Sequence, residues 1–218
     1  MIPVAVLVVA KAPVPGLAKT RLAASIGAEA AADVAAAALL DTLDAVAAAP
    51  VAKRIVALTG DLGAAVRSAE LRHRLAAFVV VPQRGAGFAE RLVNAHGDAS
   101  VAADGLPVLQ IGMDTPQVTA DLLADCAAVL TGTDAVLGLA HDGGWWVLGI
   151  QTPISAECLS DVAMSQQNTG TVTLAALHDT GVNVTLVEEL ADVDTIDDFE
   201  LVRDACAPDS RFRQLTVT

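Results

Sequence analysis

The sequence contains no tyrosine, and aromatic residues make up only 3% of its 218 residues. Hydrophobic residues still reach 54%, which predicts a core built mainly from Ala, Val, Leu and Ile, large enough for one domain. Intrinsic disorder is not expected at this composition. We therefore expect a single domain over residues 1–218, with residues 207–218 forming a loose tail.

Basic residues are scarce, because 13 Lys and Arg stand against 26 Asp and Glu, for a formal net charge of -13 and a pI near 4.4. A nucleic acid or an anionic membrane surface needs a broad basic face on its partner, so neither is expected here. Binding of small phosphorylated ligands is not excluded, because salt screens charges beyond ~8 Å and a local basic cluster is sufficient to bind them.

Cysteine is also scarce, and Cys126, Cys158 and Cys206 are odd in number and far apart. This spacing predicts neither a disulfide framework nor a structural zinc site, and it fits a reducing compartment. The apolar run 2–10 has no basic segment before it, unlike a signal peptide. It is also shorter than the ~20 residues that a membrane-spanning helix needs. We expect a cytoplasmic protein without membrane insertion.

Short apolar runs of the kind found in buried strands recur along the chain, with helical segments between most of them. Continuous apolar strands alternating with helices predict a three-layer α/β fold with a mostly parallel sheet. The strands are expected at 2–10, 54–59, 77–82, 107–112, 134–139, 145–150 and 183–187. The helices are expected near 28–48, 62–75, 86–102, 119–130, 169–179 and 195–205. The strands at 134–139 and 145–150 are separated only by a tight connection that contains His141-Asp142-Gly143-Gly144. This is too short for a parallel crossover, so these two strands should be antiparallel.

The segment AKAPVPGLAKTRL, residues 10–22, follows the first expected strand and carries three cations, while the first acidic residue of the chain is Glu29. In an open α/β sheet, the loop after the first strand is a favoured phosphate site. The spacing matches neither a P-loop nor a Gly-x-Gly-x-x-Gly dinucleotide loop, since Gly16 is its one glycine. We predict that Lys11, Gly16, Lys19 and Arg21 bind a di- or triphosphate. The alternative is three solvated cations on an ordinary turn.

Three segments, KAPVPGLAKTRL, GMDTP and DGGWWVLG, resemble the bacterial glycosyltransferase-A-like proteins described as nucleotide-diphospho-sugar transferases. That family is itself similar to nucleotidyltransferases such as the molybdenum-cofactor guanylyltransferases. The similarity extends from Lys11 to about Phe199. It implies the glycosyltransferase-A fold, a nucleotide-binding first half, and a divalent metal cofactor, Mg²⁺ or Mn²⁺.

Asp114 follows the fourth expected strand and is the first candidate for a metal ligand and for a catalytic role. Carboxylates suit a hard cation, although Asp114 also fits a turn or a cap of the helix near Thr119. Many glycosyltransferases have Asp-x-Asp at this place, whereas this chain has Gly112, so either a second ligand comes from elsewhere or the substrate holds most of the metal. Two places could supply the ligand: Asp142, and the segment 191–199. Within that segment Asp194 is the preferred second ligand, and Asp192 could equally serve.

Asp142 lies on the tight turn before the strand at 145–150, where Gly143 and Gly144 permit a close approach of a ligand. The same Asp-Gly pair is also the ordinary signal of a hairpin turn. We predict that Asp142 is catalytic and positions or deprotonates an acceptor hydroxyl. Trp145 and Trp146 must point to opposite faces of their strand, so one is expected in the core and the other is a candidate stacking surface.

Gln83 and Arg91 flank the glycine-rich segment after the third expected strand and are candidate contacts to the substrate, or a solvated helix start. Three activities fit the whole set of residues. The leading one is metal-dependent transfer of a sugar from a nucleotide-activated donor to a small-molecule acceptor. The second is nucleotidyl transfer from an NTP to a phosphorylated acceptor, with release of pyrophosphate. The third is a non-catalytic sensor of nucleotides or phosphorylated metabolites.

Overall fold

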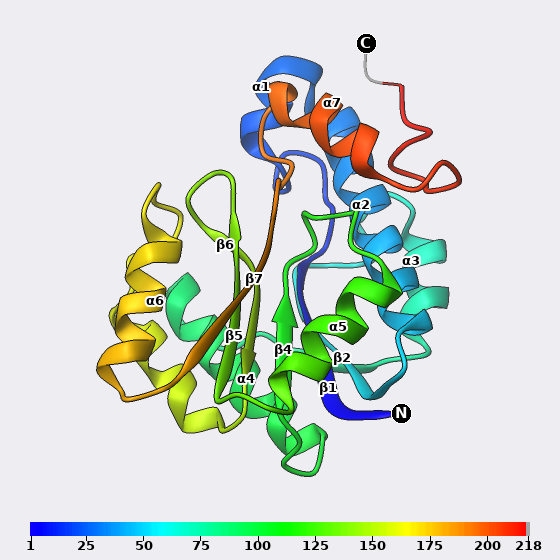
Figure 1. Ribbon diagram of the computed structural model, residues 1–218. Coiled ribbons are helices and arrows are strands. Elements are labelled where there is room, and N and C mark those ends of the chain that lie inside the picture. Colours follow the sequence, from blue (N-terminus) through cyan, green and yellow to red (C-terminus); the bar gives the residue numbers. More distant parts are fainter. Residues whose placement is uncertain (217–218) are drawn as a thin grey trace.

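Seven strands form one sheet in the order β3-β2-β1-β4-β6-β5-β7 in the computed structural model, which describes residues 1–216 (Figure 1). Every neighbouring pair is parallel except β4·β6 and β5·β6, so β6 is the one reversed strand. The predicted antiparallel pair is therefore confirmed. The strands are β1 (Ile2–Lys11), β2 (Val51–Thr59), β3 (Val79–Pro82), β4 (Val108–Ile111), β5 (Ala135–Ala140), β6 (Trp145–Ile150) and β7 (Val184–Leu190).

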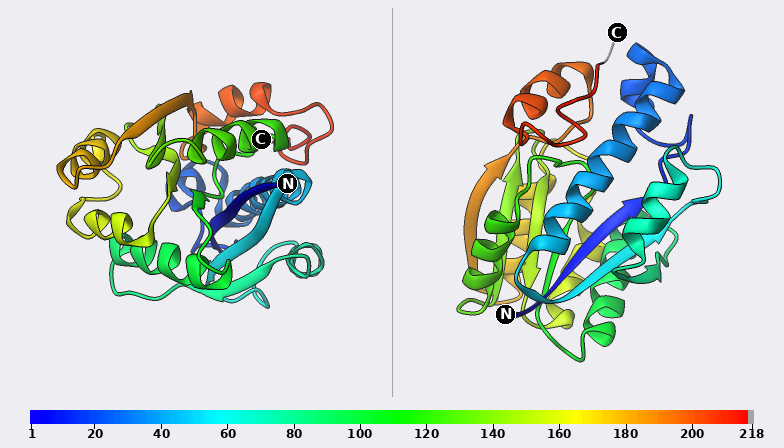
Figure 2. Two further views of the ribbon diagram at one scale, coloured as in Figure 1. Left: turned by 60° about the horizontal axis from the view of Figure 1, so that its bottom comes forward. Right: turned by 90° about the vertical axis from the view of Figure 1, so that its right-hand side faces the viewer.

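Helices cover both faces of the sheet, as the two views of Figure 2 show. One hydrophobic cluster joins the sheet to α2, α3 and α5, and a second joins its other face to α4, η1 and α6. The elements are α1 (Thr20–Ile26), α2 (Ala28–Ala48), α3 (Ser68–Leu75), α4 (Phe88–Ala102), α5 (Ala120–Leu130), the 3-10 helix η1 (Pro153–Asp161), α6 (Thr169–Asp179) and α7 (Ile196–Ala205). This is the predicted three-layer α/β arrangement, with η1 as an element that the sequence analysis did not anticipate.

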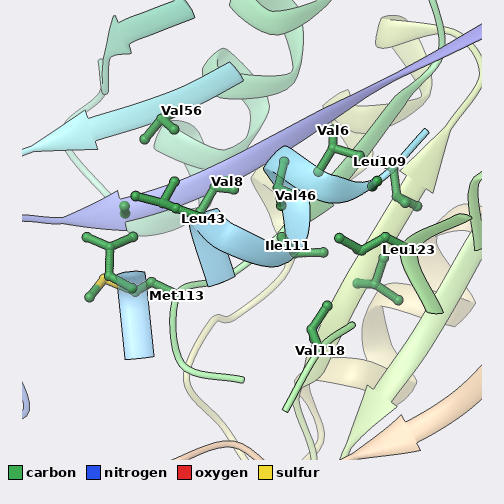
Figure 3. Packing of buried hydrophobic residues seen from close by; sticks show 14 of the residues in the cluster. Val6, Val8, Leu43, Val46, Val56, Leu109, Ile111, Met113, Val118 and Leu123 are labelled. Carbon is green, nitrogen blue, oxygen red and sulfur yellow. The ribbon is translucent and has the colours of Figure 1, made fainter. Parts of the chain in front are cut away.

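Strand β1 lies in the interior of the sheet, and its packing explains why its sequence is apolar without alternation. Val6 and Val8 contribute to the cluster under α2 and α5, while Leu7 contributes to the cluster under α4. Each of these three side chains is fully buried, as expected for a strand covered on both faces. Figure 3 shows Val6 and Val8 packed with Leu43, Val46, Val56, Leu109, Ile111, Met113, Val118 and Leu123.

A third hydrophobic cluster joins α1, the first half of α2, α7 and the end of the described chain. Its members form a cap over one end of the sheet, the end opposite the N-terminus (Figure 1). A loose tail was predicted from residue 207. Through residue 216 the chain is instead anchored by Phe212, which is fully buried, and by Arg211, which pairs with Asp41, Asp44 and Glu70. Residues 217 and 218 lie outside the described residues.

Phe212→Ala is expected to lower the free energy of unfolding by about 3–5 kcal/mol, because a fully buried ring is replaced by a cavity. The Phe212 ring lies 5.1 Å from the ring of Phe199, between centroids, so the cap loses that contact as well. Urea unfolding followed by circular dichroism measures the change. The control is Phe88→Ala, since Phe88 is 45% exposed; equal losses in the two variants would contradict the anchoring role of Phe212.

Candidate active site

The loops that carry the predicted site residues meet at one edge of the sheet. Six strands end at this edge, and the reversed strand β6 begins there. We call it the carboxyl edge, and α1 and α7 lie above it (Figure 1). Ligands of open α/β sheets bind at this edge, so the fold brings the predicted phosphate loop and the predicted carboxylates to one side of the molecule.

The basic loop, residues 11–21, is held in shape by hydrogen bonds within the loop. The amide of Ala18 donates to the carbonyl of Val14 at 3.1 Å, and Lys11 Nζ donates to the carbonyl of Leu17 at 2.6 Å. Gly16 has φ +76 and Lys19 has φ 48, both in the left-handed region, where glycine is favoured and a lysine is uncommon. This turn of the backbone places Lys19 immediately before α1.

Lys19 connects three segments that are distant in the sequence. Its Nζ lies 2.9 Å from Asp114 Oδ1 and also donates to the backbone carbonyl of Val193. The side chain is only 8% exposed, whereas the side chain of Asp114 is 41% exposed. The loop after β1, the loop after β4 and the segment after β7 therefore converge on one ammonium group, which is shielded from solvent on most of its surface.

The carboxylate of Asp192 lies near Lys19 and near two further carboxylates. Burial raises the pKa of Asp192 to about 6; the negative charge of Asp142 adds to the rise, Lys19 opposes it, and Asp114 adds to it again. Asp114 and Asp142 therefore each lie near enough to Asp192 to disfavour its ionised form. Asp142 and Asp114 were predicted site residues, and Asp192 was one of the alternatives for a further ligand.

Asp192→Asn is expected to remove a loss of stability that the native protein suffers as the pH rises. The folded protein keeps the Asp192 proton up to about pH 6, while the unfolded chain loses it near 3.8, so ionisation between these values disfavours the folded state. The free energy of unfolding of the variant, minus that of the native protein, should grow by about 2 kcal/mol from pH 4 to pH 7. Urea unfolding at four pH values measures it.

The matched control for this prediction is Asp179→Asn, at the exposed end of α6. A stability difference for Asp192→Asn that stays constant over the same pH range would contradict the raised pKa of Asp192.

Asp192 and Asp194 both lie in the segment after β7, but their carboxylates have different neighbours. The Asp194 carboxylate pairs with Arg21, and α7 begins just beyond it with a capping box between Thr195 and Asp198. Because Asp194 is engaged by an arginine while Asp192 is close to the other two carboxylates, our proposal for the second metal ligand moves from Asp194 to Asp192.

The carboxylates of Asp114, Asp142 and Asp192 are of the chemical kind that binds a hard divalent cation such as Mg²⁺ or Mn²⁺. A cation beside Asp192 would relieve the repulsion that Asp142 and Asp114 exert on its ionised form. Within residues 1–216, no three His, Cys, Asp or Glu side chains are already arranged as a metal cluster. Lys19 Nζ supplies the positive charge at Asp114 in this structure.

The turn that carries Asp142 is shaped by its glycines. Asp142 Oδ1 accepts from the amide of Gly144 at 2.7 Å, and Gly143 has φ +90. A Cβ on Gly143 would lie 1.8 Å from the carbonyl oxygen of Gln167, so the segment before α6 is packed directly against this turn. The sequence analysis did not identify that segment; its run of uncharged polar residues, Ser165–Asn168, was the one signal of it.

Gln83 and Arg91, the other predicted contacts to the substrate, lie in different parts of the structure. Gln83 Nε2 donates to the carbonyls of Ala10 and Ala57, at 2.8 and 2.9 Å, and so ties the ends of β1 and β2 together. This amide nitrogen is therefore engaged in holding the edge. The Arg91 guanidinium lies over the ring of Phe88, 5.8 Å from its centroid, at the beginning of α4.

Trp145 and Trp146 point to opposite faces, as predicted. Trp146 is 2% exposed, belongs to the cluster under α2 and α5, and donates its indole N–H to the carbonyl of Glu188 at 2.8 Å. Trp145 is half-buried against the other cluster and immediately follows Gly144. Trp145 is therefore the one of the pair that is not fully buried, and it lies beside the Asp142 turn.

The family model described as an uncharacterized protein conserved in bacteria (DUF2064) matches residues 42–166. No protein in the curated set matches the chain. Within residues 1–216, no helix combines the length and apolar character needed to cross a bilayer.

Solved structures match almost the whole chain. A crystal structure from Desulfovibrio desulfuricans G20, ascribed to a nucleotide-diphospho-sugar transferase, has a TM-score of 0.80 and 24% identity, over 100% of this chain and 93% of that one. Rv0371C of Mycobacterium tuberculosis H37Rv, in complex with manganese, has a TM-score of 0.55 and 18% identity, over 92% and 97%. CMP:2-keto-3-deoxy-manno-octonic acid synthetase, complexed with CTP, has a TM-score of 0.54 and 12% identity, over 92% and 97%. These likenesses confirm the predicted nucleotide-diphospho-sugar transferase fold.

Proposed function

The chain belongs to the bacterial family DUF2064, and we propose that it transfers a sugar from a nucleotide-activated donor to an acceptor hydroxyl. The observation that carries the proposal is the ion pair at the carboxyl edge, where Lys19 Nζ lies 2.9 Å from Asp114 Oδ1. Two cations of the basic loop thereby pair with carboxylates from two other loops, Lys19 with Asp114 and Arg21 with Asp194. A nucleoside diphosphate bound through a divalent cation needs this combination of groups.

The proposed roles follow from the positions of the side chains. Lys11, Lys19 and Arg21 would bind the diphosphate of the donor, with Lys19 exchanging Asp114 for a phosphate oxygen. Asp142, on the neighbouring turn, would orient the acceptor hydroxyl and receive its proton. A divalent cation held by Asp114 and Asp192 would neutralise charge on the departing diphosphate.

The named relatives support this choice. The D. desulfuricans protein, which shares the fold over the whole of this chain, is ascribed to the nucleotide-diphospho-sugar transferases. The manganese complex of Rv0371C agrees with the carboxylate donor set around Lys19. Both comparisons concern the fold, so the donor and the cation of this chain have to be identified by experiment.

Nucleotidyl transfer is the second candidate, and a specific observation favours it. The basic loop brings three cations to one turn, more than a diphosphate requires and enough for the triphosphate of an NTP. The CTP complex of the synthetase shows the same fold holding a nucleoside triphosphate. In this reaction an acceptor oxygen would attack the α-phosphorus, and pyrophosphate would leave.

A binding screen separates these functions. Melting temperatures are measured with UDP-, GDP- and dTDP-sugars and with free NTPs, each with and without Mn²⁺, followed by product analysis for the tightest ligands. Stabilisation by a sugar nucleotide that requires Mn²⁺ is the expected result. Turnover of an NTP with release of pyrophosphate would replace this proposal by nucleotidyl transfer, and tight binding without any product or metal effect would indicate a sensor.

A further inference from the structure

Positive charge is distributed unevenly along the chain. Residues 92–202 contain no lysine or arginine, yet they hold 17 of the 26 acidic residues. All 13 Lys and Arg lie before or after this stretch. In a chain of ordinary composition, such a long segment without a cation would be rare.

The fold converts this sequence asymmetry into a spatial one. Residues 92–202 include β4, β6, β5 and β7, which form one side of the sheet. The loops that this side sends to the carboxyl edge are 112–119, 141–144 and 191–195, and each of them contains at least one aspartate. The cations of the edge come from the other side, chiefly from the basic loop after β1.

The cations nearest to this acidic side already have partners in the site. Lys19 pairs with Asp114 and Arg21 pairs with Asp194, while Lys11 Nζ binds the carbonyl of Leu17. In the proposed function these same three groups bind the diphosphate of the donor. His141, exposed on the Asp142 turn, is the one titratable group of loops 112–119, 141–144 and 191–195 that can become positive.

A row of uncharged polar side chains stands beside the Asp142 turn. We call Ser165–Asn168 the amide segment; all four residues are exposed. The segment is fastened to the turn, because the amide of Gly170 donates to the carbonyl of Gly143 at 2.8 Å and the Gln167 carbonyl abuts Gly143. Side-chain amides and hydroxyls both donate and accept hydrogen bonds to hydroxyl groups.

We infer that the acceptor is a hydroxyl-bearing molecule without phosphate or carboxylate groups, bound between the Asp142 turn and the amide segment. This inference rests on the proposed function and names its acceptor class. An anionic acceptor would face the carboxylate of Asp142, and residues 92–202 offer no Lys or Arg to pair with it. Like charges a few ångströms apart repel by about 1–4 kcal/mol at protein surfaces. A neutral polyol meets hydrogen-bonding partners there and no such repulsion.

Matched pairs of acceptors test the inference at a saturating concentration of the donor identified by the binding screen, with Mn²⁺. The pairs are glycerol and glycerol 3-phosphate, and glucose and glucose 6-phosphate. The neutral member of each pair is expected to have at least a roughly tenfold higher kcat/KM, as follows from that repulsion. Equal or faster reaction of the phosphorylated members would overturn the inference.

Equilibrium binding gives a second readout that does not need turnover. The protein is saturated with nucleoside diphosphate and Mn²⁺, and binding of each pair is followed by NMR. Tighter binding of the phosphorylated member would overturn the inference while leaving the donor site intact. Failure of every nucleotide to bind would instead remove the proposed function, so the two failures are distinguishable.

A charge-introducing variant completes the test. Gln167→Lys places a cation in the amide segment and should narrow the preference for the neutral acceptor at least about threefold, because one repelled charge gains an attractive partner. Ala175→Lys, which adds the same charge at an exposed position of α6, is the control and should leave the preference unchanged. The same narrowing in both variants would show an effect of net charge alone and would count against the amide segment as the binding place.

Discussion

Replacing Lys19 with methionine is expected to weaken the binding of a nucleoside diphosphate about 100-fold. Methionine keeps most of the volume of the side chain but removes the ammonium that faces Asp114 and the carbonyl of Val193. Because the Lys19 side chain is only 8% exposed, its contact with a phosphate is poorly screened by solvent. The variant also leaves Asp114 uncompensated, and this carboxylate then repels the phosphate.

Isothermal titration calorimetry with and without Mn²⁺ measures the affinities. Lys53→Met is the matched control, since Lys53 belongs to β2 and makes an exposed ion pair with Asp104, with 3.4 Å between the charged atoms. Surface pairs of this kind contribute little, so the control should bind nucleotide as the native protein does. If the two variants lost affinity equally, the phosphate would have to lie elsewhere.

Gly143→Ala is expected to lower the free energy of unfolding by more than about 3 kcal/mol and to abolish transfer, because two effects combine. The backbone at Gly143 has φ +90, which an alanine adopts only with strain. Its Cβ would also lie 1.8 Å from the Gln167 carbonyl oxygen, so the Asp142 turn and the amide segment cannot keep their contact. Nucleotide binding should persist in the fraction that folds, since the basic loop lies on the other side of the edge.

Gly181→Ala separates strain from contact. Gly181 has φ +81, nearly the same conformation, but a Cβ there would have nothing within 4 Å. The control should therefore lose about 1–2 kcal/mol of stability from the left-handed conformation and keep full transfer activity. Urea unfolding and a transfer assay are run on both variants; equal stability losses would show that the Gln167 contact carries no energy.

The strands of this protein could be predicted from its sequence because most of them are covered on both faces. Val6 and Leu7 are adjacent and serve opposite clusters, so β1 appears in the sequence as an unbroken apolar run. The 3-10 helix η1 gives no comparable signal, because its buried residues, Ala156 and Leu159, are too few to show a period. The anchoring of Arg211 was also out of reach, since its partner Asp41 is 170 positions away.

The sequence indicated which loops would meet at the candidate site, but it could not distinguish between Asp192 and Asp194. Position after a strand placed Lys19 and Asp114 at the same edge, which the structure bears out with their ion pair. The choice between Asp192 and Asp194 depended on a third residue, Arg21, which is 173 positions from Asp194 and draws its carboxylate away. No local pattern carries that information, because two aspartates two residues apart in an irregular segment have equivalent sequence signals.

The adjacent tryptophans give the protein an optical property. Since the chain has two Trp and no Tyr, its intrinsic fluorescence arises almost entirely from this one dipeptide. Trp146 is sealed in the core and hydrogen-bonded to Glu188, so its emission is a constant background. The partly exposed Trp145, next to Gly144, is the fluorophore whose emission wavelength depends on solvent at the Asp142 turn. A rearrangement of that turn can therefore be followed by emission wavelength without any attached dye.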